Sequence, residues 1–181
     1  MRTWLILLAA GMSLATTIAA ASDSLSHGKI PFGEQANSQK ATEAFQAGHY
    51  DVAETIYQTM AEDHPGSRYA WSNLGVARFQ QGKLKEARDA FQHAVDLDPK
   101  DAASLASLGI TDYQLGMFRD AIDNLRVAVG LNPDDASAHQ FLGNACEKIG
   151  LKEEAKAEQK IASELGEKEL AAAKQPAPSQ H

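Results

Sequence analysis

The chain is short of cysteine, of aromatic residues and of positive charge, and each shortage narrows what it can be. Its 181 residues include one cysteine, Cys146, so no disulfide within the chain can hold the fold. An unpaired thiol could link two chains, but Cys146 falls at an inward-packing helix position, so we expect it to be buried and unreactive. The 17 Lys and Arg are outnumbered by 24 Asp and Glu, giving a net charge of -7. This balance disfavours nucleic acid and anionic lipid, since both need clustered basic side chains.

Motifs for catalysis and for metal binding are also missing. The six histidines are scattered, and none stands four residues from another as in H-E-x-x-H. We expect His139 to be a helix residue packed at a joint rather than a ligand. The sequence contains no G-x-S-x-G, and its repeated glycines do not cluster into a phosphate-binding loop. We therefore expect no enzymatic activity, no cofactor and no metal.

The strongest apolar run lies at the N-terminus. Arg2 is followed by an apolar stretch over residues 4–14, and Ala19-Ala20-Ala21 offers a cleavage site before Ser22. This layout predicts a secretory signal peptide over residues 1–21. An uncleaved membrane anchor is the alternative, but the run is shorter than the ~20 residues needed to span a bilayer. We expect a chain secreted across the inner membrane into the periplasm, with no membrane insertion after cleavage.

A fixed period of 34 residues organises the rest of the chain. The residues that keep this step are Gly48, Gly82, Gly116 and Gly150; Ala53, Ala87, Ala121 and Ala155; and Pro65, Pro99 and Pro133. A period of this length is typical of a solenoid, in which each unit buries its apolar face against its neighbours.

The unit that begins at Arg68 shows what one repeat contains. Apolar residues share one face of a helix over about 68–81, and others share a face of a second helix over about 85–97. Gly82 can end the first helix in the left-handed conformation, and Pro99 closes the unit. Short polar residues, Ser67, Asp101 and Asp135, stand where they can cap the first helices.

Small residues mark the place where the two helices of a unit should cross. Gly75 and Ala87 leave no bulky side chain there, so the backbones can approach closely and Phe91 can fill the adjacent space. A larger residue at Ala87 would force the hairpin open.

These residues resemble the tetratricopeptide repeat family, whose pattern reads W-x2-L-G-x2-Y, A-x3-F, A and P. The matching residues are Trp71-x2-Leu74-Gly75, Ala87-x3-Phe91, Ala94 and Pro99, then Leu108-Gly109, Ala121-x3-Leu125, Ala128 and Pro133. The family's tyrosine slot departs from the pattern, because it holds Arg78, Asp112 and Cys146.

The resemblance implies an all-α, right-handed superhelical solenoid of antiparallel helix pairs. We expect four units, at about 34–67, 68–101, 102–135 and 136–167, and polar residues on the last unit such as Lys152 and Lys156 should form a cap. The remaining segments are an irregular leader over 22–33, a short capping helix over 168–174 after a break at Gly166, and a disordered tail over 175–181.

The resemblance also implies that the first helices line a concave groove that binds peptides. The predicted groove residues are Tyr69, Ser72, Asn73, Val76, Phe79, Ala106, Ile110, Tyr113 and Gln140. They are uncharged, which suits the apolar face of a partner helix or a segment with a few hydrophobic anchors. Of the basic and amide positions that clamp a C-terminal carboxylate in some family members, Asn73 alone is matched, so we reject that mode.

Two further choices stay open at the level of sequence. Phe45, Phe79 and Tyr113 could form an aromatic row for a ligand, but packing between hairpins is the favoured interpretation. Tyr69, Ser72 and Asn73 are better candidates for contact, because packing does not require them.

The function we expect is an exported, non-enzymatic scaffold that binds a peptide or helix of a partner protein within a cell-envelope assembly. The alternative is a structural protein that self-assembles by head-to-tail stacking.

Overall fold

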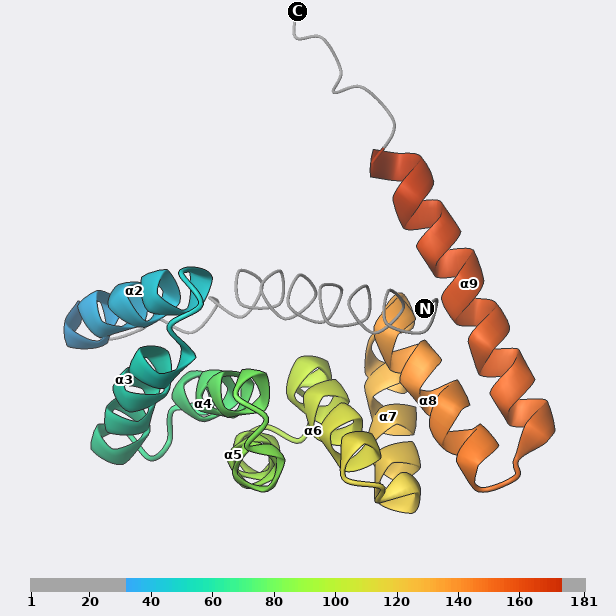
Figure 1. The fold of residues 1–181 in the computed structure, drawn as a ribbon, viewed down its shortest axis with the longest axis horizontal. Helices are drawn as coiled ribbons and strands as arrows, with labels where there is room; N and C mark the ends of the chain where they lie inside the picture. The colour runs from blue at the N-terminus through green and yellow to red at the C-terminus, as the bar shows by residue number, and fades with distance from the viewer. Residues whose placement is uncertain (1–31, 174–181) are drawn as a thin grey trace, which may run out of the picture.

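A computed structural model describes residues 32–173 as a stack of helical hairpins (Figure 1). The helices are α2 (Phe32–Gln46), α3 (Tyr50–Asp63), α4 (Arg68–Gln80), α5 (Leu84–Leu97), α6 (Ala102–Gln114), α7 (Phe118–Leu131), α8 (Ala136–Lys148) and α9 (Lys152–Ala173). No strand occurs within this range. Each helix packs mainly against the helices before and after it in sequence, as the predicted all-α solenoid requires. The predicted signal peptide at 1–21 and the tail at 175–181 lie outside the described residues.

The four spaced glycines end the first helix of each hairpin in the predicted way. Gly48, Gly82, Gly116 and Gly150 have φ of 78°, 73°, 78° and 85°, and no other residue of the described range has φ in the left-handed region. The amide of Gly82 donates to the carbonyl of Phe79, and the next amide, of Lys83, donates to that of Arg78. These bonds satisfy carbonyls that the end of a helix leaves unpaired.

Two of the three predicted caps form, and one does not. Ser67 Oγ accepts from the amide of Ala70, and Asp135 Oδ1 accepts from the amide of Ala138. The side chain of Asp101 caps no amide, because its Oδ2 accepts from Arg68 Nη1 at 2.8 Å and from Ser104 Oγ at 2.5 Å. A charged partner on the preceding hairpin outcompetes the local amide for this carboxylate.

The second, third and fourth hairpins each close over a glycine on the first helix, at Gly75, Gly109 and Gly143. A Cβ at Gly75 would lie 2.7 Å from ring carbons of Phe91, and one at Gly109 would lie 2.6 Å from Leu125 Cγ. At Gly143 the same atom would lie 3.0 Å from the carbonyl oxygen of Ala155. The close crossing predicted at Gly75 is therefore present in three successive hairpins.

Two expected segments differ from the structure. Helix α2 begins at Phe32, so the leader expected to reach residue 33 ends earlier. Helix α9 continues through Gly166 to Ala173, so 168–173 belongs to α9 and is not a separate capping helix. One glycine costs a helix only about 1 kcal/mol relative to alanine, and the flanking Ala, Glu, Lys and Leu all favour helix. No helix within 32–173 combines the length and the apolar character needed to cross a membrane.

Candidate protein-interaction groove

The first helices of the hairpins form the inner layer of the stack. Helix α4 contacts α6, and α6 contacts α8, although each pair is separated in sequence by a whole helix. Helices on the inner side of a curved stack approach one another more closely than those outside, so α2, α4, α6 and α8 line the concave face (Figure 1). Side chains spaced three or four residues apart on these helices share that face.

The structure places the nine predicted groove residues at different depths. Ser72, Val76, Ala106 and Ile110 are buried; Tyr69, Asn73, Phe79 and Tyr113 are half-buried; and Gln140 is exposed. Val76 packs in one cluster with Phe91 and Leu108, and Ile110 packs in another with Leu125 and Leu142. Most of the set is therefore also part of the packing between hairpins.

The polar residues at the N-terminal end of the groove are bonded to one another. Tyr69 Oη lies 2.6 Å from Ser38 Oγ on α2, and its ring meets that of Tyr57 edge-on at 6.2 Å between centroids. Ser104 Oγ lies 3.3 Å from Ser72 Oγ, within hydrogen-bond distance. The expectation that packing does not require Tyr69 and Ser72 is wrong, because both join neighbouring hairpins.

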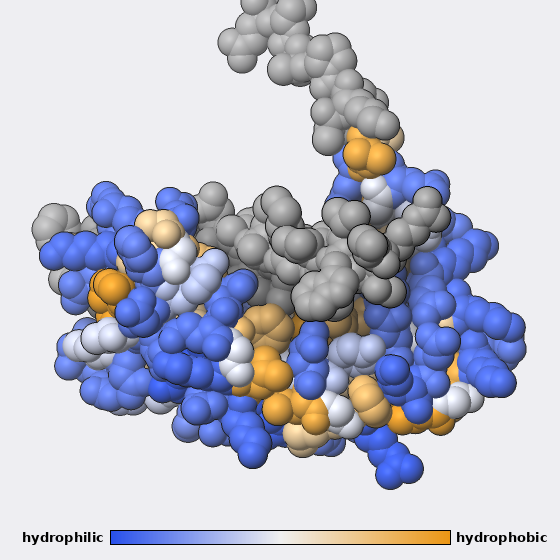
Figure 2. All heavy atoms as spheres, in the orientation of Figure 1, coloured by the Kyte–Doolittle hydropathy of each residue, from blue (hydrophilic) through white to orange (hydrophobic). Residues whose placement is uncertain are grey.

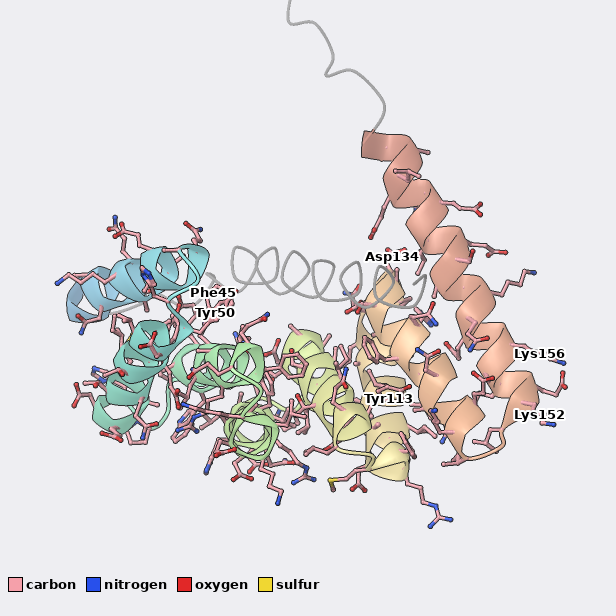
Figure 3. The ribbon with its side chains drawn as sticks, in the orientation of Figure 1. Phe45, Tyr50, Tyr113, Asp134, Lys152 and Lys156 are labelled. Carbon is pink, nitrogen blue, oxygen red and sulfur yellow. The ribbon has the colours of Figure 1, made fainter. Side chains whose placement is uncertain are left out.

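The contacts of Phe45, Phe79 and Tyr113 agree with the interpretation that these rings pack between hairpins. Phe45 meets the ring of Tyr50 at 5.0 Å, where α2 turns into α3 (Figure 3). Tyr113 contacts the rings of Phe118 and Phe141 at 5.6 and 5.4 Å, and Phe79 packs against buried residues of two clusters. These side chains join successive hairpins and are only partly available to a ligand.

The ionisable groups of the groove face before the end of α8 are the hydroxyls of Tyr69 and Tyr113, and Glu147 and Lys148 follow at that end. Stepping by three or four residues along each first helix gives Ser38, Thr42 and Gln46; Tyr69, Asn73, Val76 and Gln80; Ala103, Ala106, Ile110 and Gln114; and Gln140, Asn144 and finally Lys148. By contrast, 23% of the whole chain is Asp, Glu, Lys or Arg. An exposed charged side chain costs little free energy in water. The lack of acidic and basic side chains on this face therefore favours an uncharged ligand surface.

Three residues of this face were missed by the sequence analysis. Gln46, Gln80 and Gln114 stand 34 residues apart, and Gln80 and Gln114 follow Val76 and Ile110 by four residues, so periodicity could have found them. Gln46 and Gln114 are exposed and Gln80 is half-buried, and none of the three side chains hydrogen-bonds within the described part of the chain. Each primary amide can donate two hydrogen bonds and accept others. The groove thus presents one free amide on each of three successive hairpins.

The position that departs from the family pattern, held by Arg78 and Asp112, joins consecutive hairpins through ion pairs. Arg78 Nε donates to Glu54 Oε1 on α3 at 3.0 Å, and Arg88 Nε on α5 donates to Asp112 Oδ1 at 2.6 Å. The signs of the two ion pairs are opposite, although Glu54 and Arg88 are separated by one repeat, as are Arg78 and Asp112. In the next hairpin the same two positions hold Ile122 and Cys146, which are both buried in one apolar cluster.

The pKa values of the two acids in these ion pairs, Asp112 and Glu54, shift in opposite directions. Asp112 is fully buried, and its loss of hydration raises its pKa, although hydrogen bonds from Arg88 and Asn124 act the other way. Burial also acts to raise the pKa of Glu54, but hydrogen bonds from Lys83, Gln81 and Arg78 outweigh it and lower that pKa. Asp112 therefore depends on its single cation more than Glu54 depends on any one partner.

His139 packs at a joint between hairpins, as expected. It is 6% exposed, its Nδ1 lies 2.6 Å from Glu158 Oε2, and its Nε2 lies 3.1 Å from the carbonyl oxygen of Pro133. Trp71, in the same position two repeats earlier, donates from Nε1 to the carbonyl of Pro65 at 2.9 Å. Both rings tie a first helix to the turn before it. Within residues 32–173 no three His, Cys, Asp or Glu side chains gather as a metal site would need.

Cys146 is expected to resist alkylation in the folded protein. Its side chain is fully buried, and burial raises its pKa to about 11, so the thiolate that attacks electrophiles is scarce at neutral pH. Mass spectrometry after iodoacetamide treatment should show no label on the native chain and full label in denaturant. Labelling of the native chain at the rate of a free thiol would contradict this.

Comparison with known proteins identifies the fold family. The tetratricopeptide repeat family model matches residues 38–102 and 107–174, so the chain belongs to this family. Among solved structures, a crystal structure of MamA is 27% identical, with a TM-score of 0.66 over 72% of this chain and 77% of that one. The first TPR domain of Spaghetti (RPAP3), bound to the HSP90 peptide SRMEEVD, is 20% identical, with a TM-score of 0.62 over 64% of this chain and 91% of that one.

A third similar structure belongs to a much longer protein. The Thermobaculum terrenum O-GlcNAc transferase is 28% identical, with a TM-score of 0.58, and the match covers 62% of this chain but 22% of that one. The likeness is therefore to a part of that protein. None of the curated proteins matches the chain.

Proposed function

We propose that this chain is an exported, non-enzymatic scaffold that holds an uncharged segment of a partner protein in its concave groove. The observation that carries the proposal is the groove face itself, which lacks acidic and basic side chains from Ser38 to Asn144 and offers the free amides of Gln80 and Gln114. A segment with apolar anchors can bury them here without stranding a charge, and its backbone can bond to the amides. Export into the periplasm and membership of a cell-envelope assembly rest on the N-terminal pattern over residues 1–21.

The solved relatives support binding of protein segments in general. Spaghetti (RPAP3) is seen with a peptide whose sequence, SRMEEVD, is strongly charged. The groove of this chain lacks charges to match such a peptide, so its ligand should differ in chemistry. The head-to-tail alternative is less well supported, because Lys152 and Lys156 point outward from α9 (Figure 3) and Lys156 is 73% exposed. A polar outer face is what a terminal repeat without a further neighbour needs, which supports the predicted cap.

Two charges placed in the groove should abolish partner capture. In Gln80→Glu with Gln114→Glu, each carboxylate would have to lose water against an uncharged ligand, so binding should weaken about tenfold or more per site. The measurement is quantitative crosslinking and recovery of partners from envelope extracts by the full chain. Tyr69 and Ser72 are unsuitable targets, because their loss would also loosen the hairpins.

The matched control changes two amides into carboxylates outside the groove. Gln92→Glu lies on α5, and Asn132→Asp lies in the turn between α7 and α8. The control should recover the same partners as the parent at the same yield. The proposal fails if the parent recovers no partner, or if the groove variant and the control perform alike.

A further inference from the structure

The turns inside the third and fourth hairpins form an apolar edge that the stack does not need. Ile149 and Leu151, in the α8–α9 turn, are 40% and 39% exposed. Leu115, Met117 and Phe118, in and beside the α6–α7 turn, are half-buried. Figure 1 places both turns at the same edge, and Figure 2 shows hydrophobic atoms reaching the surface along it. We call these five residues the turn patch.

The second hairpin shows that a polar turn serves the fold equally well. Gln81 and Lys83 stand one repeat before Leu115 and Met117, and both bond to Glu54 Oε2, at 2.8 and 2.6 Å. Packing within the stack therefore does not explain the apolar side chains at the equivalent positions Leu115, Met117, Ile149 and Leu151, whereas Phe118 also packs on Tyr113. Contiguous apolar side chains on a surface mark a contact with another molecule more often than isolated ones do.

The shape of the turn patch combines a hollow with a protruding side chain. Gly116, Met117, Phe118, Arg119, Asp120 and Ile149 line a shallow hollow of about 410 Å³. Leu151 follows the lining residue Ile149 by two positions, and its side chain is 39% exposed. A surface with both features can fit a rotated copy of itself.

The charges around the turn patch favour a second copy over other partners. Three exposed cations flank the patch, and each stands next in sequence to an exposed anion: Arg119 to Asp120, Lys148 to Glu147 and Lys152 to Glu153. The rim is therefore neutral, whereas the chain carries a net charge of -7 that makes two copies repel elsewhere. A neutral rim of mixed sign does not attract an anionic membrane, but it complements itself when a two-fold axis brings cations opposite anions.

We infer that two copies of this chain associate through the turn patch as a two-fold dimer. Leu151 of each copy enters the hollow of the other copy. Arg119 and Lys148 face acidic residues across the two-fold axis. The contact leaves the concave groove of each copy open, so the dimer presents two grooves at once. Small interfaces of this kind bind in about the micromolar range.

Sedimentation equilibrium of the full chain at about 1–200 µM tests the dimer. The parent should dimerise, and Ile149→Glu with Leu151→Glu should raise the dissociation constant at least tenfold. Both side chains are on the surface, and circular dichroism should confirm an unchanged helix content. The matched control, Val127→Glu with Leu131→Glu, adds the same charge at side chains on α7 that are 49% and 44% exposed, and it should dimerise like the parent.

Two outcomes would overturn the inference. A parent that stays monomeric up to the highest concentration has no such contact. A turn-patch variant that dimerises as tightly as the parent places the contact elsewhere in the chain. The groove variant Gln80→Glu with Gln114→Glu should still dimerise, so failure of the proposed function and failure of the dimer can be told apart.

Discussion

Arg88→Ile is expected to lower the free energy of unfolding by about 3–5 kcal/mol, because it leaves a buried carboxylate without its cation. Asp112 has no exposed side-chain surface, and Arg88 Nε lies 2.6 Å from its Oδ1. The amide of Asn124 donates to Oδ2 at 2.9 Å, but a neutral donor cannot replace the charge. Urea unfolding followed by circular dichroism measures the loss.

The chain itself contains the substitution that should reverse this loss. One repeat later the two positions hold Ile122 and Cys146, an apolar pair at the same kind of interface. The double variant Arg88→Ile with Asp112→Cys should therefore recover most of the stability, since an apolar pair often equals or exceeds a buried ion pair. If the double variant is as unstable as Arg88→Ile, the buried charge is not the cause of the loss.

The loss in Arg88→Ile should also depend on pH, and its sign follows from Asp112. Burial raises the pKa of Asp112 in the folded protein above its ordinary value of 3.8, and removal of Arg88 must raise it further. The folded state then binds a proton more readily than the unfolded state, so stability falls as the pH rises through this range. The deficit of Arg88→Ile relative to the double variant should be smaller near pH 4 than at pH 7.

The repeat and its turns could be predicted from sequence because their causes are local. Gly82 and Gly116 take a conformation that glycine adopts most easily, and Pro99 and Pro133 close hairpins through their fixed rings. The predicted helix over about 68–81 is confirmed by α4, which spans Arg68–Gln80. Such features recur every 34 residues, so one unit supports the interpretation of the next.

Contacts between hairpins could not be predicted in the same way, because each depends on a particular partner about 20 to 35 residues away. The partner of Tyr69 is Ser38 at a separation of 31, and that of Arg78 is Glu54 at 24. The repeat pattern says which positions meet but not which pairs bond. The carboxylate of Asp101 shows the consequence, since its sequence position predicts a cap and Arg68 binds it instead.

The groove could be predicted from the sequence only in part. The face on which Asn73, Val76 and Ile110 stand follows from helical spacing, and the missed Gln80 and Gln114 obey the same spacing. Helical spacing does not predict how deeply each of these side chains is buried. Val76 and Ile110 are buried at 5% and 4% exposure, while Gln114 is exposed, so the residues most open to a partner are the polar ones.

Gly109→Ala is expected to destabilise the third hairpin by about 1–3 kcal/mol, the cost of overpacking a filled interior. The new Cβ would lie 2.6 Å from Leu125 Cγ and 3.1 Å from the carbonyl oxygen of Ala121. Leu125 could change its rotamer, but the carbonyl is part of the α7 backbone, so α6 and α7 must separate. This cost outweighs the gain of up to about 1 kcal/mol that alanine brings to a helix.

Gly166→Ala is the matched control for this effect. It makes the same substitution inside α9, where a Cβ meets nothing within 4 Å, so propensity alone acts and the chain should gain about 0.5–1 kcal/mol. Amide hydrogen exchange should show faster opening of α6 and α7 in Gly109→Ala and slower opening of α9 in Gly166→Ala. If both substitutions stabilise, the close crossing at Gly109 does not limit how the hairpin packs, and the glycine on each first helix has no steric role.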